Sequence, residues 1–214
     1  MNKNLKILVA DDHPMLLKGL VQEFSENGYH QLLQAHNGAV ALEQILSETP
    51  DVAVLDIEMP LLTGFEVITK AKQHGVATKF IILTSHKEKG FIIRAKKLNI
   101  DGYLLKDEPF SEIQNCIESI QNNVSYFSKK FEQVFENQVA PTMAKINFLS
   151  PSERTILRLV AQRKSSKEIG EIIQISYRTV QKHRTNIIDK LGLDPAPDAL
   201  LMWAEENREL LQNI

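Results

Sequence analysis

The stretch from Val52 to Pro60 limits the possible folds of this chain more than any other segment. Four apolar residues run directly into Asp56, and a proline follows at position 60. A short apolar run with β-branched residues predicts a buried strand, and proline does not continue a central strand. Asp56 is therefore expected at the carboxyl end of a buried strand, where open α/β sheets bind their ligands. By itself, an aspartate at such a place is most often a turn former or a helix cap.

Strand-like and helix-like segments alternate over the first half of the chain. Besides the Asp56 strand, apolar runs predict strands at residues 5–10, 31–35, 80–84 and 102–106, and apolar residues at helical spacing follow each strand. Five strands alternating with five helices predict an α/β fold, with helices on both faces of a parallel sheet. We expect a doubly wound, flavodoxin-like sheet of strand order 2-1-3-4-5.

Polar side chains follow four of these strands. Asp11 and Asp12 follow the first strand and Asp56 the third, while Thr84 ends the fourth and Lys106 the fifth. These four strands are neighbours in the expected order, so their carboxyl ends converge on one pocket. Carboxylates suit Mg²⁺, and Asp56 is the natural nucleophile for a phosphoryl group, since aspartyl phosphate is an established covalent form. Each residue taken singly also has a structural explanation, such as helix capping for Asp11 and Asp12.

Taken together, these residues and their neighbours resemble the receiver domain of two-component response regulators. The resemblance covers residues 5 to about 122 and rests on a specific set of motifs. The matching segments are Asp11-Asp12, Leu-Asp56-Ile-Glu-Met-Pro, Thr84-Ser85 and Gly-Tyr-Leu-Leu-Lys106. The family likeness implies that Asp56 accepts a phosphoryl group from a sensor histidine kinase.

The resemblance also implies a role for each residue around Asp56. It implies that Mg²⁺, or Mn²⁺, is held by Asp12, Asp56 and the backbone carbonyl of Glu58, with Asp11 assisting through water. The remaining implied residues are Thr84 and Lys106, which would bind the phosphoryl oxygens as catalytic partners of Asp56, and Tyr103, an aromatic switch residue coupled to Thr84.

The middle of the chain shows no clear strand pattern. Residues 1–122 form the predicted receiver and 148–214 a second domain, so 123–147 is expected to be a partly helical linker. Aromatic residues between 127 and 135 predict a short amphipathic helix. The segment from Gln138, which contains Pro141, is typical of a tether.

Charge is distributed unevenly along the chain. Residues 149–193 hold nine Lys and Arg against four Asp and Glu, whereas residues 1–148 hold fifteen against eighteen. The residues from Asp194 onward are acidic again. A basic block inside an acidic protein indicates a polyanionic partner for that block alone.

The basic block has the pattern of a helix-turn-helix. Ser150 and Ser165 begin capping boxes, each with a Glu three residues later, and Ser176 caps a longer helix that runs to Leu191. The outer face of that helix is basic and rich in amides, which is typical of a recognition helix. A solvated helix face in an ordinary bundle is the alternative, and composition alone does not separate the two. A last helix is expected from Pro197 to about Leu211.

Four segments of this block carry a second resemblance, namely residues 149–154, 167–169, 175–183 and 190–192. The order of residues in them resembles the four-helix LuxR-type DNA-binding domain. With the receiver, this gives the architecture of the NarL/FixJ response regulators. Arg163 stands where that family commonly has Gly, and the last helix, which carries Trp203, provides the dimer contact in relatives. The DNA-binding residues that the resemblance implies are Gln181, Lys182 and Thr185 at base edges and Arg178, Arg184 and Asn186 at phosphates.

We therefore expect a transcription regulator, not an enzyme acting on other substrates, that is switched by phosphorylation of Asp56. The expected active form is a homodimer that binds double-stranded DNA with two-fold related half-sites. A regulator that acts without phosphorylation stays open as an alternative. This chain lacks the Asp-x-Asp pair that metal-dependent phosphohydrolases usually carry, which argues against that class of enzyme. An FMN-binding protein would not have two aspartates in its phosphate-binding loop, where this chain has Asp11 and Asp12.

A cytoplasmic protein without membrane association is expected. The first residues lack a signal-peptide pattern, and the longest apolar runs have only strand length. Cys116 is the single cysteine and falls in an apolar helical pattern, so it predicts a small buried side chain.

Overall fold

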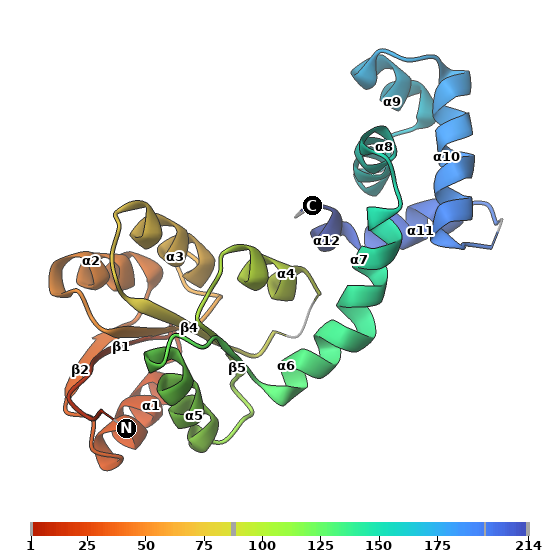
Figure 1. Cartoon of the computed structure of the whole chain (residues 1–214). Helices are drawn as coiled ribbons and strands as arrows, with labels where there is room; N and C mark the ends of the chain where they lie inside the picture. The colour runs from red at the N-terminus through yellow and green to blue at the C-terminus, as the bar shows by residue number, and fades with distance from the viewer. Residues whose placement is uncertain (1, 87–88, 195, 213–214) are drawn as a thin grey trace. The chain divides into compact units, whose positions relative to one another are not determined.

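The chain folds into two compact units, described from a computed structural model of residues 2–86, 89–194 and 196–212. The first unit consists mainly of residues up to 132, and the second mainly of residues from 133 onward. Figure 1 shows the sheet of the first unit and the helices of the second. No helix among the described residues combines the length and the apolar character that crossing a membrane requires.

A parallel sheet of order β2-β1-β3-β4-β5-β6 forms the centre of the first unit. Its first five strands confirm the expected doubly wound topology. Figure 1 shows α1 and α5 on one face of the sheet and α2 and α3 on the other. The strands are β1 (Lys6–Ala10), β2 (Gln31–Ala35), β3 (Val52–Leu55), β4 (Lys79–Thr84), β5 (Gly102–Leu105) and β6 (Tyr126–Phe127). The helices are α1 (Pro14–Glu26), α2 (Gly38–Glu48), α3 (Gly64–Gln73), α4 (Lys89–Lys97) and α5 (Phe110–Gln121).

Both faces of the sheet are apolar at its centre, as the sequence pattern requires. All four residues of β3 are buried, because strands covered on both faces need apolar side chains in both directions. One cluster joins alternate residues of the strands, among them Val9 and Val54, to Phe24 of α1 and Ile117 of α5. Cys116 is part of this cluster and is fully buried, in agreement with the sequence prediction.

The structure differs from the sequence expectation directly after α5, because a sixth strand joins the sheet there. Tyr126 pairs with Gly102 and Phe127 with Tyr103, in parallel register. The backbone N–H of Tyr126 donates to the carbonyl of Asp101, and that of Ser128 donates to the carbonyl of Tyr103. A strand of two residues is too short to show a period-two pattern in the sequence. This strand forms because the edge of β5 offers unpaired backbone groups.

The segment expected to be a tether is helical. Lys129–Val134 (α6), a π-helical turn at Phe135–Val139 (η1) and Ala140–Asn147 (α7) follow one another directly. Pro141 lacks an N–H and would interrupt regular α-helical bonding, but the wider π turn lies directly before it. The Thr142 hydroxyl then donates to the carbonyl of Gln138 at 2.8 Å. A helix can therefore continue past the proline that suggested a break.

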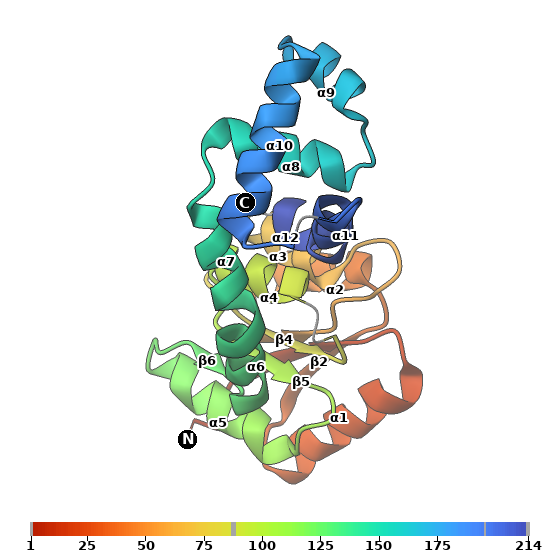
Figure 2. The ribbon, with the colours of Figure 1, turned by 90° about the vertical axis from the view of Figure 1, so that its right-hand side faces the viewer.

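The second unit contains the expected helix-turn-helix. Its core includes Ile156, Val180 and Ile187, which are fully buried. Figures 1 and 2 both show α9 beside α10, and these two helices make direct contact. The helices after α7 are α8 (Pro151–Ala161), α9 (Ser166–Ile173), α10 (Tyr177–Leu191), α11 (Ala199–Glu206) and α12 (Arg208–Gln212).

Two details of this unit bear on the sequence expectations. Arg163, where the family resemblance leads us to expect Gly, has φ of 63°, so this residue adopts the left-handed conformation without being glycine. The expected last helix is two helices, α11 and α12, separated by Asn207. The Asn207 side chain is buried and donates to the carbonyl of Trp203, and such side-chain bonds compete with helical bonding.

Candidate functional site

The four strand ends meet at one edge of the sheet, as their order requires. The backbone continues the strand pairing into the site: the N–H of Asp56 donates to the carbonyl of Ala10 at 2.9 Å, and that of Lys106 donates to the carbonyl of Thr84 at 2.8 Å. These bonds fix the backbone from which the functional side chains extend. Asp56 and Thr84 are both buried.

Lys106 binds two of the carboxylates at once. Its Nζ lies 2.7 Å from Asp11 Oδ2 and 2.9 Å from Asp56 Oδ2. The second oxygen of Asp56 accepts a hydrogen bond from the backbone N–H of Ile57 at 2.8 Å. The second oxygen of Asp11 accepts from the backbone N–H of His13 at 2.9 Å. Asp56 is thus held with one oxygen on an ammonium group and the other on a backbone donor.

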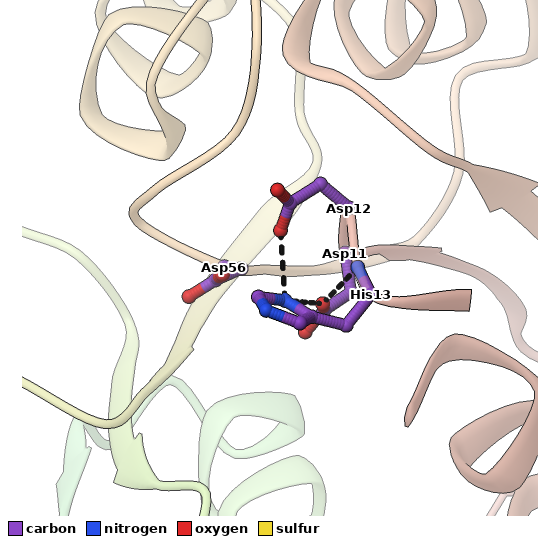
Figure 3. Close-up of side chains that lie close together, drawn as sticks. All are labelled: Asp11, Asp12, His13 and Asp56. Atoms are coloured by element: carbon purple, nitrogen blue, oxygen red, sulfur yellow. Dashed lines mark hydrogen bonds and ion pairs between the residues drawn. The ribbon is translucent and has the colours of Figure 1, made fainter. Parts of the chain in front are cut away.

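Asp12 and His13 complete an acidic cluster around Asp56. Ligand atoms of Asp11, Asp12, His13 and Asp56 all lie within 4.8 Å of one another. Figure 3 shows the His13 ring in contact with both Asp11 and Asp12. Asp12 Oδ1 lies 2.9 Å from His13 Nδ1, yet no hydrogen bond of normal geometry reaches this buried oxygen from the described residues.

The cluster carries more negative charge than Lys106 balances. Burial raises the pKa of the Asp56 carboxyl, and the neighbouring Asp11 acts in the same direction, whereas Lys106 opposes both. Burial by itself would lower the pKa of Lys106, but its hydrogen bonds to Asp11 and Asp56 raise it. Lys106 therefore stays an ammonium group. Three aspartates and one lysine leave an excess of two negative charges when all are ionised, which suits a divalent cation.

Thr84 and Tyr103 are connected through His86. The Thr84 hydroxyl accepts a hydrogen bond from the backbone N–H of His86 at 3.1 Å, and the Tyr103 hydroxyl donates to the carbonyl of His86 at 3.1 Å. The Tyr103 ring is fully buried and lies 4.6 Å from the Phe131 ring, centre to centre. The His86 ring in turn pairs with the Glu58 carboxylate at 3.2 Å.

The second unit presents a separate polar surface on α10. Four of the six residues expected to contact DNA line one open hollow of about 650 Å³, together with Ser176 and Thr179. These four are Arg178, Gln181, Lys182 and Thr185. Arg184 and Asn186 do not line it and are half-buried. Burial lowers the pKa of the Arg184 guanidinium.

Comparisons with known proteins assign both units. Residues 7–118 match the response regulator receiver domain family, and residues 147–203 match the bacterial regulatory proteins of the luxR family. The chain is 32% identical to the transcriptional regulatory protein DesR of Bacillus subtilis over 203 residues, which cover 94% of this chain and 98% of that protein. This chain belongs to the response-regulator family. It combines a receiver with a LuxR-type DNA-binding domain, as the sequence predicts.

Solved response regulators share the architecture. RcsB from Salmonella enterica serovar Typhimurium, bound to promoter P1flhDC in the presence of phosphomimetic BeF₃⁻, aligns over 95% of this chain and 98% of its own. The TM-score is 0.66 at 22% identity. A LuxR-family DNA-binding response regulator from Staphylococcus aureus aligns over 54% of this chain and 98% of its own, with a TM-score of 0.52 and 31% identity.

Three contacts to the expected site residues of this response regulator were not predicted from the sequence. His13 directly follows Asp11 and Asp12, so its position beside these two carboxylates was predictable from the order of residues alone. Tyr177 precedes Gln181 by four positions on one helix, a spacing that places the two side chains on the same face. Ser166 also contacts Gln181 but belongs to α9, so only the packing of the two helices reveals it.

Proposed function

We propose that Asp56 is the phospho-acceptor of this response regulator and that its donor is the phosphohistidine of a sensor histidine kinase. The observation that carries the proposal is the buried Asp56 carboxylate with Lys106 at 2.9 Å and the carboxylates of Asp11 and Asp12 beside it. An Asp56 oxygen attacks phosphorus, the bond from phosphorus to the imidazole nitrogen breaks, and the histidine leaves with that electron pair. The receiver catalyses only its own phosphorylation and dephosphorylation.

The residues at this edge fit Mg²⁺, or Mn²⁺, as a cofactor. Carboxylate and carbonyl oxygens are the ligands that these hard cations prefer, and Asp12 Oδ1 is a buried oxygen without a normal hydrogen bond from the described residues. Asp12, Asp56 and the backbone carbonyl of Glu58 would hold the ion, with Asp11 assisting through water. When bound, the cation supplies charge neutralisation between the carboxylates and the incoming phosphoryl oxygens.

The protein's own cationic and hydroxyl groups act on the phosphoryl oxygens. Lys106 already contacts Asp56, so its ammonium group needs only a small movement to pair with a phosphoryl oxygen. The Thr84 hydroxyl supplies a second hydrogen bond. Movement of Thr84 disturbs its bond to His86, and His86 also holds the Tyr103 hydroxyl. This chain of contacts is the proposed route from Asp56 phosphorylation to the switch residue.

The output of the switch is proposed to be dimerisation and sequence-specific DNA binding in the cytoplasm. Gln181, Lys182 and Thr185 would contact base edges, with Arg178 at phosphates, because these four side chains share one face of α10. Arg184 and Asn186 would reach phosphates at the margin of that face. A homodimer pairs two recognition helices, so its DNA half-sites are expected to be two-fold related.

An intact-mass measurement with the small-molecule donor acetyl phosphate tests the proposal. Wild-type protein with Mg²⁺ should gain one phosphoryl group and then bind specific DNA more tightly in a mobility-shift assay, whereas Asp56→Asn should do neither. Glu58→Gln is the matched control: it keeps the backbone carbonyl, so incorporation should persist.

Two results would contradict the proposal. Equal incorporation into Asp56→Asn would exclude Asp56 as the acceptor. Normal incorporation with unchanged DNA affinity would favour the alternative, a regulator that acts without phosphorylation.

A further inference from the structure

The amide group of Gln181 is already hydrogen-bonded within the protein. Its Nε2 donates to the Tyr177 hydroxyl at 2.8 Å and to the Ser166 hydroxyl at 3.2 Å. Tyr177 is the first residue of α10, and Ser166 is the first residue of α9. The two hydroxyls therefore reach Gln181 from both helices of the helix-turn-helix.

These two bonds use all the donor capacity of the side chain. A glutamine amide nitrogen carries two hydrogens, which is one for each of the two hydroxyls. The polar atom left for a ligand is the carbonyl oxygen Oε1, which only accepts hydrogen bonds. Ser166 is buried, so leaving its hydroxyl without this partner would carry a desolvation cost. The acceptor-only state of Gln181 is thus supported by the packing of α9 against α10.

The state of the amide decides which bases Gln181 can recognise. A free glutamine binds adenine with two bonds, donating to N7 and accepting from the N6 amino group. If Gln181 has no free donor hydrogen, it can form only the hydrogen bond in which its oxygen accepts. In the major groove the amino groups that can donate to it are adenine N6 and cytosine N4, whereas guanine O6 and thymine O4 are acceptors and repel Oε1.

We propose that Tyr177 and Ser166 are positioning residues that make Gln181 an acceptor-only reader of major-groove amino groups, selecting adenine or cytosine. The inference rests on the proposed DNA-binding function and names the base specificity of that same surface. Gln181 lines the α10 hollow beside Lys182 and Thr185, so its amide lies on the face assigned to bases. Neither Tyr177 nor Ser166 needs to touch a base in this arrangement.

Selection from a random-sequence DNA duplex library with phosphorylated full-length protein provides the first step of the test. Repeating the selection with Gln181→Ala identifies the base position that Gln181 specifies, because preference there should disappear. Duplexes with each of the four bases at that position, and one with 7-deaza-adenine, then measure the recognition. The 7-deaza base lacks the N7 acceptor but keeps the N6 amino group.

Wild-type protein should bind the adenine and cytosine duplexes with similar affinity and should tolerate 7-deaza-adenine. The guanine and thymine duplexes should bind about tenfold more weakly, the usual scale of a base mismatch. The variant Tyr177→Phe/Ser166→Ala frees the amide hydrogens, so it should prefer adenine over cytosine and lose about tenfold on 7-deaza-adenine. In a Gln181→Ala background the same two substitutions should leave the base preferences unchanged, which a merely structural role would not predict.

Several results would overturn the inference. Loss of wild-type affinity on 7-deaza-adenine would show that Gln181 donates to N7, and identical base preferences in wild type and Tyr177→Phe/Ser166→Ala would remove the role of the hydroxyls. A Gln181→Ala selection with all preferences intact would exclude Gln181 as a reader. Each of these leaves the proposed DNA binding in place, whereas failure of wild-type protein to select any sequence would overturn both. Unchanged Trp203 fluorescence would show that the variants remain folded.

Discussion

Asp56 and Gly64 lie so close together that the backbone leaves no room for a side chain at residue 64. A Cβ atom on Gly64 would lie 2.2 Å from the carbonyl oxygen of Asp56 and 3.3 Å from the Cα of Ile57. The backbone N–H of Gly64 also donates to the carbonyl of Ile57 at 2.9 Å. The start of α3 is therefore packed directly against the backbone that carries Asp56, the proposed phospho-acceptor.

Gly64→Ala should destabilise the receiver because the added methyl group forces this backbone apart. Overpacking of this kind typically costs about 1–3 kcal/mol. Calorimetry of the full chain should show a lower unfolding temperature for the receiver, with phosphorylation of Asp56 slowed. Gly19→Ala is the matched control, since a Cβ there meets nothing within 4 Å and alanine favours a helix. A receiver of unchanged stability in Gly64→Ala would show that the close contact relaxes freely.

At the scale of secondary structure, three helices in the described part of the chain begin with a complete capping box, in which a Ser or Thr and a Glu three residues later bond to each other's backbone. These are Thr63 with Glu66, Ser150 with Glu153 and Ser165 with Glu168. Glu153 differs from the other two because it is buried and also accepts a hydrogen bond from Lys190 of α10 at 2.7 Å. One carboxylate thus caps α8 and ties it to α10, the proposed recognition helix.

Glu153→Gln should keep the cap but lose the ion pair to Lys190, at a cost of about 1–2 kcal/mol in unfolding free energy. Burial by itself would raise the pKa of Glu153, but the hydrogen bonds from Lys190 and Ser150 lower it below its usual value. Its stabilising contribution is therefore complete above the pKa of the unfolded chain and is lost as pH falls through the folded pKa. Denaturant titrations at several pH values, followed by the fluorescence of Trp203, the single tryptophan, measure this.

The exposed box of α9 gives the control for this prediction. Glu168→Gln should have a smaller effect, because Glu168 is open to solvent and its pairing with Lys164 is screened. The stability of the wild-type protein should fall as the pH drops below the usual pKa of a glutamate, and the stability of Glu153→Gln should fall less. If the stability of the wild type and that of Glu153→Gln depended equally on acid, the loss of stability would come from other carboxylates.

At the scale of the whole molecule, the chain keeps opposite charge in its two parts. The basic block from residue 149 to 193, with nine Lys and Arg and four Asp and Glu, contrasts with the acidic receiver. Binding to a polyanion through such a block releases counterions, so the affinity falls steeply with salt. An acidic receiver does not share in this attraction.

Arg178→Ala should reduce the slope of log K against log salt concentration by about 1, which is the expected loss of one phosphate contact. The weakening should be nearly uniform across DNA sequences, since phosphate contacts carry no sequence information. Lys18→Ala, an exposed residue of the receiver, is the control and should leave the slope unchanged. Fluorescence anisotropy with labelled duplexes over a range of salt concentrations makes the comparison. An unchanged slope in Arg178→Ala would remove Arg178 from the proposed phosphate contacts.

The sequence by itself determined the features that depend on local patterns. Strand ends, helix starts and capping boxes follow from periodicity and from hydrogen bonds between near neighbours, so the residues around Asp56, Ser150 and Ser176 were enough to place them. The alternation of elements restricted the sheet to a few topologies, and the expected order 2-1-3-4-5 is one of them. The convergence of the acidic residues on one edge was predictable for the same reason.

Only the tertiary structure decided the features that depend on distant partners. Lys106 is shared between Asp11 and Asp56, β6 forms on the open edge of β5, and Ser166 engages the amide of Gln181. A local pattern records which groups need a partner, but it does not record which partner packing brings within hydrogen-bond distance. Contacts between elements far apart in the chain set that distance. They therefore determine which hydrogen-bond partners these side chains have.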